Sequence, residues 1–142
     1  RLGKHIESRF AHKYYSEIAL GIDFTARDVQ ARCKEKGLPW EKAKAFDGSA
    51  AVSKFFPLAT IGKDIQNINF HLNINGTTVQ SGSTANMLFS VHEIISHVSK
   101  YFTLKTGDLI FTGTPAGVGR VEREDLLELF LEEERVFYFN VK

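Results

Sequence analysis

The sequence contains a single cysteine, Cys33, so it cannot form an internal disulfide, and this scarcity favours a reducing compartment. Neither sign of charge predominates, because 18 Lys and Arg face 17 Asp and Glu, and no basic stripe of the kind that binds nucleic acid is present. No window approaches the roughly 18 apolar residues that a membrane-spanning helix needs. We therefore expect a cytoplasmic protein whose partners include neither nucleic acid nor a membrane.

The first residue is Arg1 rather than methionine, and we expect the sequence to be part of a longer chain. Its 142 residues, 43% of them hydrophobic, suffice for one domain with a substantial core. We accordingly treat residues 1–142 as a single domain that is incomplete at its N-terminal side.

Strands dominate the predicted fold. Apolar and polar residues alternate over residues 66–74, and the Asn75-Gly76 pair that follows is the strongest short signal for a hairpin turn, with a return strand over Thr77–Ser81. The other predicted strands are a long one over Tyr14–Phe24, a buried one over Asp108–Thr112, and a final hairpin over Leu127–Leu131 and Val136–Val141 with Glu132-Glu133-Glu134 at its solvated tip.

Two principal helices are predicted. The first runs over Ala26–Lys36, with Thr25 as its N-cap and Gly37 at its end, and the second covers Ser83–Phe102, where apolar residues recur at three- and four-residue steps. Two shorter segments complete the prediction: a helical turn around Ser8–Lys13 and an irregular or extended stretch over Glu41–Phe46. This order of elements predicts a mainly β α+β domain rather than a doubly wound one.

The stretch from Gly21 to Asp47 is the best candidate for a site, because a strand ending on Asp23 leads directly into a helix. At roughly 100° per residue, positions 23, 27 and 30 lie within about 60° of one face, so Asp23, Arg27 and Gln30 would converge. An acid can hold a divalent cation, a guanidinium can clamp a carboxylate, and an amide can hydrogen-bond a neighbouring oxygen. On spacing alone, a solvent-exposed Asp–Arg pair explains the pattern as well.

Several short blocks resemble the fumarylacetoacetate hydrolase family, most closely its short acylpyruvase and oxaloacetate decarboxylase members. They occur in family order, with family spacing, and the resemblance covers essentially the whole chain. The blocks are DFTARDVQ (23–30), LPW (38–40), AKAFD (43–47), TGTP (112–115) and GVG (117–119).

The resemblance implies the β-roll, or folded β-sandwich, of this family's catalytic domain, and Mg²⁺ or Mn²⁺ as the cofactor. It implies that Asp23 is a metal ligand, that Arg27, Gln30 and Thr114 bind substrate, and that Lys44 acts beside the developing negative charge. The metal would serve as a Lewis acid for a 2-oxo acid whose C–C bond breaks. Without the resemblance, Lys44 would be interpreted as a surface lysine, and at most one of Lys42 and Lys44 is expected to point inward.

The implied function is that of a hydrolase or decarboxylase acting on a small 2-oxo acid of the acylpyruvate, fumarylpyruvate or oxaloacetate type. An isomerase or decarboxylase of the 2-hydroxyhepta-2,4-diene-1,7-dioate type and a non-catalytic binding or assembly domain are the alternatives. The resemblance also implies a homodimer.

One carboxylate cannot hold a hard cation tightly. The family's other two ligands are glutamates that would precede Arg1, so we expect the isolated 142 residues to be weakly active or inactive. The pairs Glu122 with Glu124, and Glu132 with Glu134, have the same spacing but lie in polar segments, and we do not expect them to substitute.

Four other features are not expected to form separate sites, although the resemblance implies that the glycines of residues 113–119 permit close backbone approach to an oxo acid. His92 and His97 are five residues apart, about 140° around a helix, and cannot bind one zinc ion as histidines four apart do. The glycines of residues 113–119 lack the Lys-Ser or Lys-Thr of a nucleotide-binding loop. His71 is expected to face solvent, and Cys33 is expected to be structural.

Overall fold

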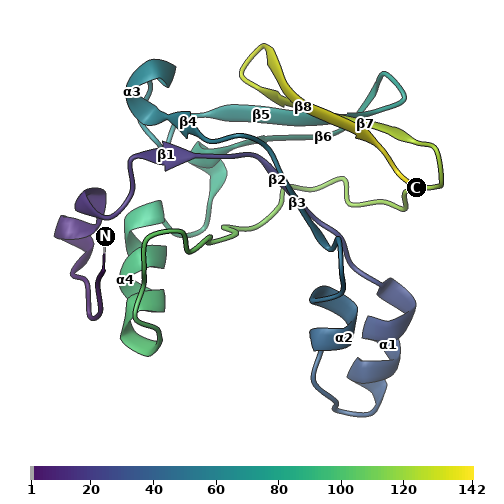
Figure 1. Cartoon of the computed structure of the whole chain (residues 1–142), viewed down its shortest axis with the longest axis horizontal. Helices are drawn as coiled ribbons and strands as arrows, with labels where there is room; N and C mark the ends of the chain where they lie inside the picture. Colours follow the sequence, from purple (N-terminus) through teal and green to yellow (C-terminus); the bar gives the residue numbers. More distant parts are fainter. Residues whose placement is uncertain (1) are drawn as a thin grey trace.

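A four-stranded antiparallel sheet forms the largest layer of the computed structural model, which describes residues 2–142; Arg1 lies outside the described residues (Figure 1). Its strand order is β6-β5-β7-β8. The strands are β5 (Asn69–Ile74), β6 (Thr77–Ser83), β7 (Leu126–Leu131) and β8 (Glu134–Asn140). Every second residue of β7 is buried, namely Leu127, Leu129 and Leu131, so this strand supplies the centre of the sheet's apolar face.

The hairpin predicted around Asn75-Gly76 is confirmed. Both turn residues have positive φ, 50° and 78°, as a two-residue hairpin turn requires. The Asn75 side chain also donates to Asp125 and accepts from the backbone N–H of Leu126, which ties the turn to the start of β7. The return strand β6 is two residues longer than predicted, because it pairs with β5 as far as Ser83.

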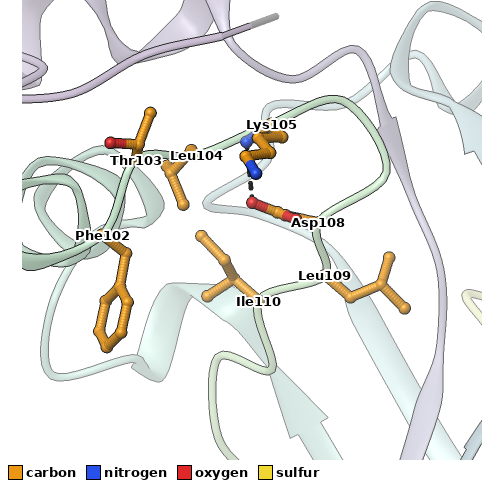
Figure 2. Close-up of a pocket in the computed structure, with 7 residues that line it drawn as sticks. All are labelled: Phe102, Thr103, Leu104, Lys105, Asp108, Leu109 and Ile110. Carbon is orange, nitrogen blue, oxygen red and sulfur yellow. Dashed lines mark hydrogen bonds between the residues drawn. The ribbon is translucent and has the colours of Figure 1, made fainter.

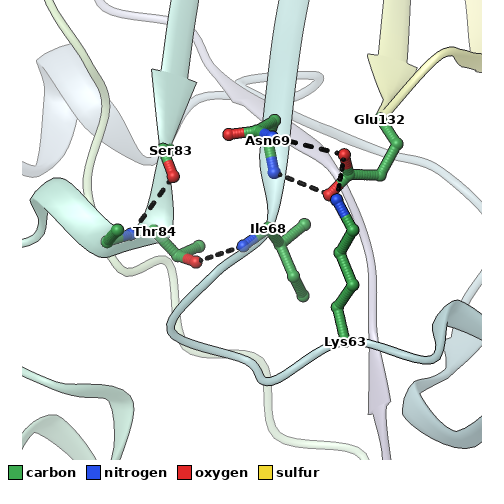
Figure 3. Close-up of polar contacts among 7 residues, drawn as sticks. Lys63, Ile68, Asn69, Ser83, Thr84 and Glu132 are labelled. Carbon is green, nitrogen blue, oxygen red and sulfur yellow. Dashed lines mark hydrogen bonds and ion pairs between the residues drawn. The ribbon is translucent and has the colours of Figure 1, made fainter.

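The C-terminal hairpin is likewise confirmed, with one change at its tip. Glu132 has a φ of 52°, and its carboxylate accepts hydrogen bonds from Lys63 and from the backbone N–H of Asn69, as Figure 3 shows. Glu132 therefore links the β7–β8 turn to the segment that enters β5 and is not simply solvated.

The predicted long strand over Tyr14–Phe24 is wrong, because it is two short strands with different partners. β1 (Glu17–Ile18) pairs with β4 (Phe56–Pro57), whereas β2 (Gly21–Asp23) pairs with β3 (Ala50–Val52). The chain changes partner at Ser53, whose backbone N–H donates to Leu20 and whose hydroxyl accepts from the N–H of Leu20.

The first principal helix, α1 (Arg27–Glu35), matches the prediction to within a residue at each end, but its predicted cap is wrong. Ala26 is the N-cap residue, and its methyl side chain cannot accept a capping hydrogen bond, whereas the Thr25 hydroxyl accepts from Lys44. The prediction of an irregular or extended stretch over Glu41–Phe46 is also wrong, since this segment contains the helical turn α2 (Glu41–Lys44). Its fully buried Ala43 accepts from the N–H of Ala26 and packs α2 against α1, away from the four-stranded sheet (Figure 1).

The second principal helix is shorter than predicted, because a break separates the 3₁₀ turn η2 (Thr84–Asn86) from α4 (Val91–Tyr101). Ser90 begins α4 with a capping box in which Ser90 and Glu93 bond each other's backbone N–H. The predicted turn η1 (Ser8–Lys13) is confirmed as 3₁₀ helix and packs against α4. Ile6, Ala11 and Ile95 form the buried cluster between them.

The predicted buried strand over Asp108–Thr112 is wrong. Within residues 2–142 this segment pairs with no strand, and Leu109 and Phe111 are 52% and 45% exposed. Figure 2 shows its start, where the backbone N–H of Lys105 donates to Asp108 and closes a turn beside a hollow of about 410 Å³. The remaining helix is α3 (Leu58–Ile61). The observed class is nonetheless the predicted one, a mixed α+β chain composed mostly of strands in small sheets.

Candidate active site

A large cavity of about 1380 Å³ collects most of the predicted site residues. Strand β2 and the start of α1 form one wall, the apolar face of β5 and β7 forms another, and residues 108–121 cross between them. Asp23, Arg27, Lys44 and Thr114 all line it. Three segments that are distant in the sequence therefore meet at one hollow, whereas the smaller hollow of Figure 2 contains none of these residues.

Lys44 joins two oxygen atoms at the end of β2. Its ammonium Nζ lies 2.6 Å from Asp23 Oδ2 and 2.8 Å from Thr25 Oγ1. The pairing of Asp23 with Ala50 fixes the strand end, and the bond from Ala26 N to Ala43 O brings the end of α2 beside it. Lys44 is thus the lysine of the Lys42/Lys44 pair that reaches the cavity.

The Asp23–Lys44 pair is partly open to solvent, with side-chain exposures of 47% and 36%. Attraction between charges in such a setting is screened, and isolated pairs of this kind add little to stability. The pair is therefore better understood as an arrangement of charge than as a fold-stabilising contact, and both groups can be reached by a small solute.

Arg27 and Gln30 lie on the first turn of α1, but only Arg27 is among the described residues that line the cavity. Asp23 and Arg27 therefore line the same cavity, and the roles expected of them stay predictions. Gln30 lies three residues after Arg27 on the helix, and its contact with substrate also stays a prediction.

Thr114 is held by a residue that the sequence did not reveal. The side-chain amide of Gln80, on β6, donates to Thr114 Oγ1 at 3.0 Å and to the carbonyl of Pro115 at 3.1 Å. Gln80 lies in the middle of β6 and carries no motif of its own. Simple alternation along residues 77–81 places it on the face opposite Val79, so the sequence pattern did not mark it as part of the cavity wall.

The types of donor atom around Asp23 suit a hard divalent cation. A carboxylate oxygen and a hydroxyl oxygen already converge on the positively charged Lys44 ammonium, and oxygen is the donor that Mg²⁺ and Mn²⁺ prefer. The number of donors is small, because residues 2–142 contain no group of three or more His, Cys, Asp or Glu placed to hold a metal. Among the alternatives considered, Glu122 pairs with Arg120 and Glu132 with Lys63, and neither glutamate lines the cavity.

The histidines and the cysteine make other contacts, although His71 also lines the cavity. Tyr15 Oη and His92 Nε2 are 2.7 Å apart, and His71 stacks on Phe130 with ring centroids 4.3 Å apart. Burial, with Asp64 nearby, raises the pKa of Tyr15 above its ordinary value. His71 is half-buried rather than fully solvent-facing, and Cys33 is buried in α1.

Comparison with known proteins now defines the class. The fumarylacetoacetate hydrolase C-terminal family matches residues 1–137, and the chain belongs to this family. The resemblance inferred from the sequence blocks is confirmed, and so is the family fold.

The particular relatives narrow the class further. The mitochondrial oxaloacetate tautomerase of Mus musculus is 45% identical over 140 residues, which cover 99% of this chain and 63% of that protein. The oxaloacetate tautomerase of Escherichia coli (strain K12) is 47% identical over 108 residues, or 76% of this chain and 49% of that protein. The chain thus spans about half to two thirds of the length of these relatives.

Solved structures of this family also superpose on the chain. The fumarylpyruvate hydrolase of Pseudomonas aeruginosa, in complex with Mn²⁺ and pyruvate, superposes with a TM-score of 0.89 at 34% identity, covering 100% of this chain and 60% of that one. A fumarylacetoacetate hydrolase family protein from yeast superposes with a TM-score of 0.87 at 30% identity, covering 100% and 62%. None of the helices within residues 2–142 has the length and apolar character needed to cross a membrane.

Proposed function

We propose that this chain is part of a metal-dependent enzyme that acts on a small 2-oxo acid. The observation that carries the proposal is the cluster of Asp23, Thr25 and Lys44 in the lining of a cavity that Arg27 and Thr114 also line. An acid and two cationic groups around one hollow suit an anionic substrate and a metal ion together. The relatives support it, because three of the four named above carry names of enzymes of oxaloacetate or fumarylpyruvate.

Each residue has a distinct task in this proposal. Arg27 binds the substrate carboxylate, since its planar guanidinium matches two oxygens at once, and Gln30 assists from the same helix. Thr114 donates its hydroxyl proton to a substrate oxygen from the segment that crosses between the two walls. Lys44, beside Asp23, stabilises negative charge as it develops on the oxo oxygen.

Asp23 would be one ligand of Mg²⁺ or Mn²⁺, and the ion would supply Lewis-acid chemistry when bound. We propose that further carboxylate ligands come from residues outside the 142 described by this sequence. The support is that residues 2–142 contain no group of three or more acidic, histidine or cysteine side chains placed to hold a metal, together with the 37% or more of the named tautomerases that this chain does not cover. The isolated chain should then bind metal weakly and turn over little.

For the reaction, we propose cleavage of the C–C bond between the carbons α and β to the oxo group, by hydrolysis or decarboxylation, with the bonding electrons passing into an enolate. Oxaloacetate tautomerisation is the second candidate, and the names of the relatives favour it. Both reactions need the same charge stabilisation at the oxo oxygen. They differ in whether carbon dioxide or an acid leaves, or only a proton moves. An isomerase of aromatic-degradation diacids remains a third possibility.

The exchange Asp23→Asn in the full-length protein tests the metal site. Without the negative charge the cation loses a ligand, so Mn²⁺ at about 100 times the wild-type Kd should stabilise the wild type by about 2.7 kcal/mol and the variant by far less. The control is Glu122→Gln, whose carboxylate is 63% exposed, pairs with Arg120 and lies outside the cavity. Equal Mn²⁺ stabilisation of both variants would contradict the assignment and favour a non-catalytic assembly domain.

Product analysis distinguishes the reactions. Oxaloacetate would be supplied with Mg²⁺ or Mn²⁺ while released carbon dioxide, pyruvate and the enol absorbance are followed, and acylpyruvate would be supplied in parallel. Loss of enol absorbance without pyruvate would establish tautomerisation alone. The homodimer and the cytoplasmic location stay predictions; sedimentation and cell fractionation address them, and the mouse relative is named as mitochondrial.

A further inference from the structure

The loop that carries Thr114 is docked on the edge strand β6 through unusually close contacts. Gly117 has a φ of 97°, and a Cβ added there would lie well inside van der Waals contact with the Val79 carbonyl oxygen. A Cβ added at Gly82 would lie 3.0 Å from the Pro115 side chain. Both contacts require glycine and leave the loop little freedom relative to β6.

A β-bulge in β6 decides which side chain meets this loop. Asn73 pairs with Thr78, but Leu72 pairs with Gln80, so Val79 is an extra residue in the strand. Had the register continued without the bulge, Val79 would lie opposite Leu72, and Gln80 would face the other side of the sheet. Since paired residues share a face, the bulge places a polar amide among the apolar side chains that line the cavity.

The contacts of Gln80 fix the orientation of its amide. The Pro115 carbonyl can only accept, so the atom 3.1 Å from it must be the amide nitrogen. The same nitrogen lies 3.0 Å from Thr114 Oγ1, and its second proton is donated there. The threonine hydroxyl is therefore an acceptor toward Gln80.

A hydroxyl that accepts a hydrogen bond on one side keeps its own proton for another partner. We propose that Gln80 is a positioning residue that holds the Thr114 hydroxyl so that its proton points into the cavity, toward a carboxylate or oxo oxygen of the bound 2-oxo acid. This inference rests on the proposed function, and it assigns to the β6 bulge the task of delivering Gln80 to the loop.

A double-mutant cycle in the full-length protein tests it, with Mn²⁺ present and pyruvate as the probe. Gln80→Met keeps the side-chain length but removes the amide, and Thr114→Val keeps the shape but removes the hydroxyl. Gln80→Glu offers only an acceptor and would draw the Thr114 proton toward itself. Thr78→Val is the control, because Thr78 lies on the same strand, bonds Asn73 and does not line the cavity.

The expected result is a Kd for pyruvate raised roughly tenfold by Gln80→Met, with a larger increase for Gln80→Glu, the loss of one or two directed hydrogen bonds being the cause. The KM for oxaloacetate should rise with the Kd while kcat changes less. In the Thr114→Val background Gln80→Met should have no further effect, whereas in the conservative Thr114→Ser background its effect should persist. Thr78→Val should bind as the wild type does.

Different results would contradict the positioning role of Gln80 and the proposed function. An unchanged Kd in Gln80→Met, or an equal effect of Gln80→Met with and without the Thr114 hydroxyl, overturns the positioning role. An unchanged Kd in Thr114→Val overturns the substrate contact on which the proposed function depends. Circular dichroism of each variant separates these results from loss of fold. If Gln80→Met unfolds, Gln80→Glu takes its place in the cycle.

Discussion

Gly117→Ala is the substitution whose effect the structure specifies most fully. The residue has a φ of 97°, where an alanine is strained by about 1–3 kcal/mol. The added methyl also meets the Val79 carbonyl oxygen closer than 3.0 Å, a separation that real Cβ contacts essentially never fall below. Because that oxygen belongs to the backbone of β6, it cannot move aside as the end of a flexible side chain would.

The cost has an upper bound, since the loop can leave β6 instead of accepting the clash. Undocking breaks the two hydrogen bonds that Gln80 donates, each contributing about 0.5–1.5 kcal/mol, so the total loss should be about 1–3 kcal/mol. The cheaper response moves Thr114 away from its place in the cavity. We therefore expect binding of a 2-oxo acid to suffer more than stability.

Two other glycines in the same loop provide matched controls. Gly113 has a φ of 118° but open space around it, so Gly113→Ala reports strain alone. Gly119 has neither positive φ nor a neighbour within 4 Å, and Gly119→Ala should be neutral or slightly stabilising. Urea unfolding measures the free energy of each variant, and calorimetry with pyruvate and Mn²⁺ measures binding to the full-length protein. If Gly117→Ala behaved like Gly119→Ala in both assays, the docking of this loop on β6 would be refuted.

Three further substitutions probe other parts of the chain. Ser90→Ala removes the capping box of α4 and should cost about 1 kcal/mol in urea unfolding, and a loss near zero would show that the helix does not depend on its cap. The hydrogen bonds from Lys63 and Asn69 hold the pKa of Glu132 below its ordinary 4.5. The ionised Glu132 carboxylate should therefore contribute about 0.5–1 kcal/mol to the free energy of unfolding above pH 4.5, a small amount because the pair is partly exposed. This contribution is lost as the pH falls through the lowered pKa. Glu132→Gln should therefore weaken the fold at pH 7 and match the wild type in strong acid; a constant difference across the range would contradict this. Leu127→Ala, at a fully buried position, should lower the free energy of unfolding by about 2–5 kcal/mol, whereas Leu109→Ala, at a position 52% exposed, should lower it far less. Similar losses in the two variants would support the buried strand first predicted for residues 108–112.

Local sequence patterns determined the elements whose stability is local. The Asn75-Gly76 turn needs two positive φ angles and the sequence supplies residues that tolerate them, so the hairpin was predictable. The family was predictable from short blocks in order, and those blocks also named Asp23, Lys44 and Thr114. Regular alternation likewise sufficed for the C-terminal hairpin.

Tertiary structure decided the features that depend on contacts between distant residues. The N-cap pattern at Thr25 is sound by itself, but the helix begins one residue later, with Ala26 as its N-cap, and Lys44, 19 residues away, donates to the Thr25 hydroxyl. The strand propensity of residues 108–112 found no partner strand within residues 2–142, and a strand without a partner has no ladder. Gln80 became part of the site through one extra residue in β6, because a register shift changes the face on which every following side chain lies.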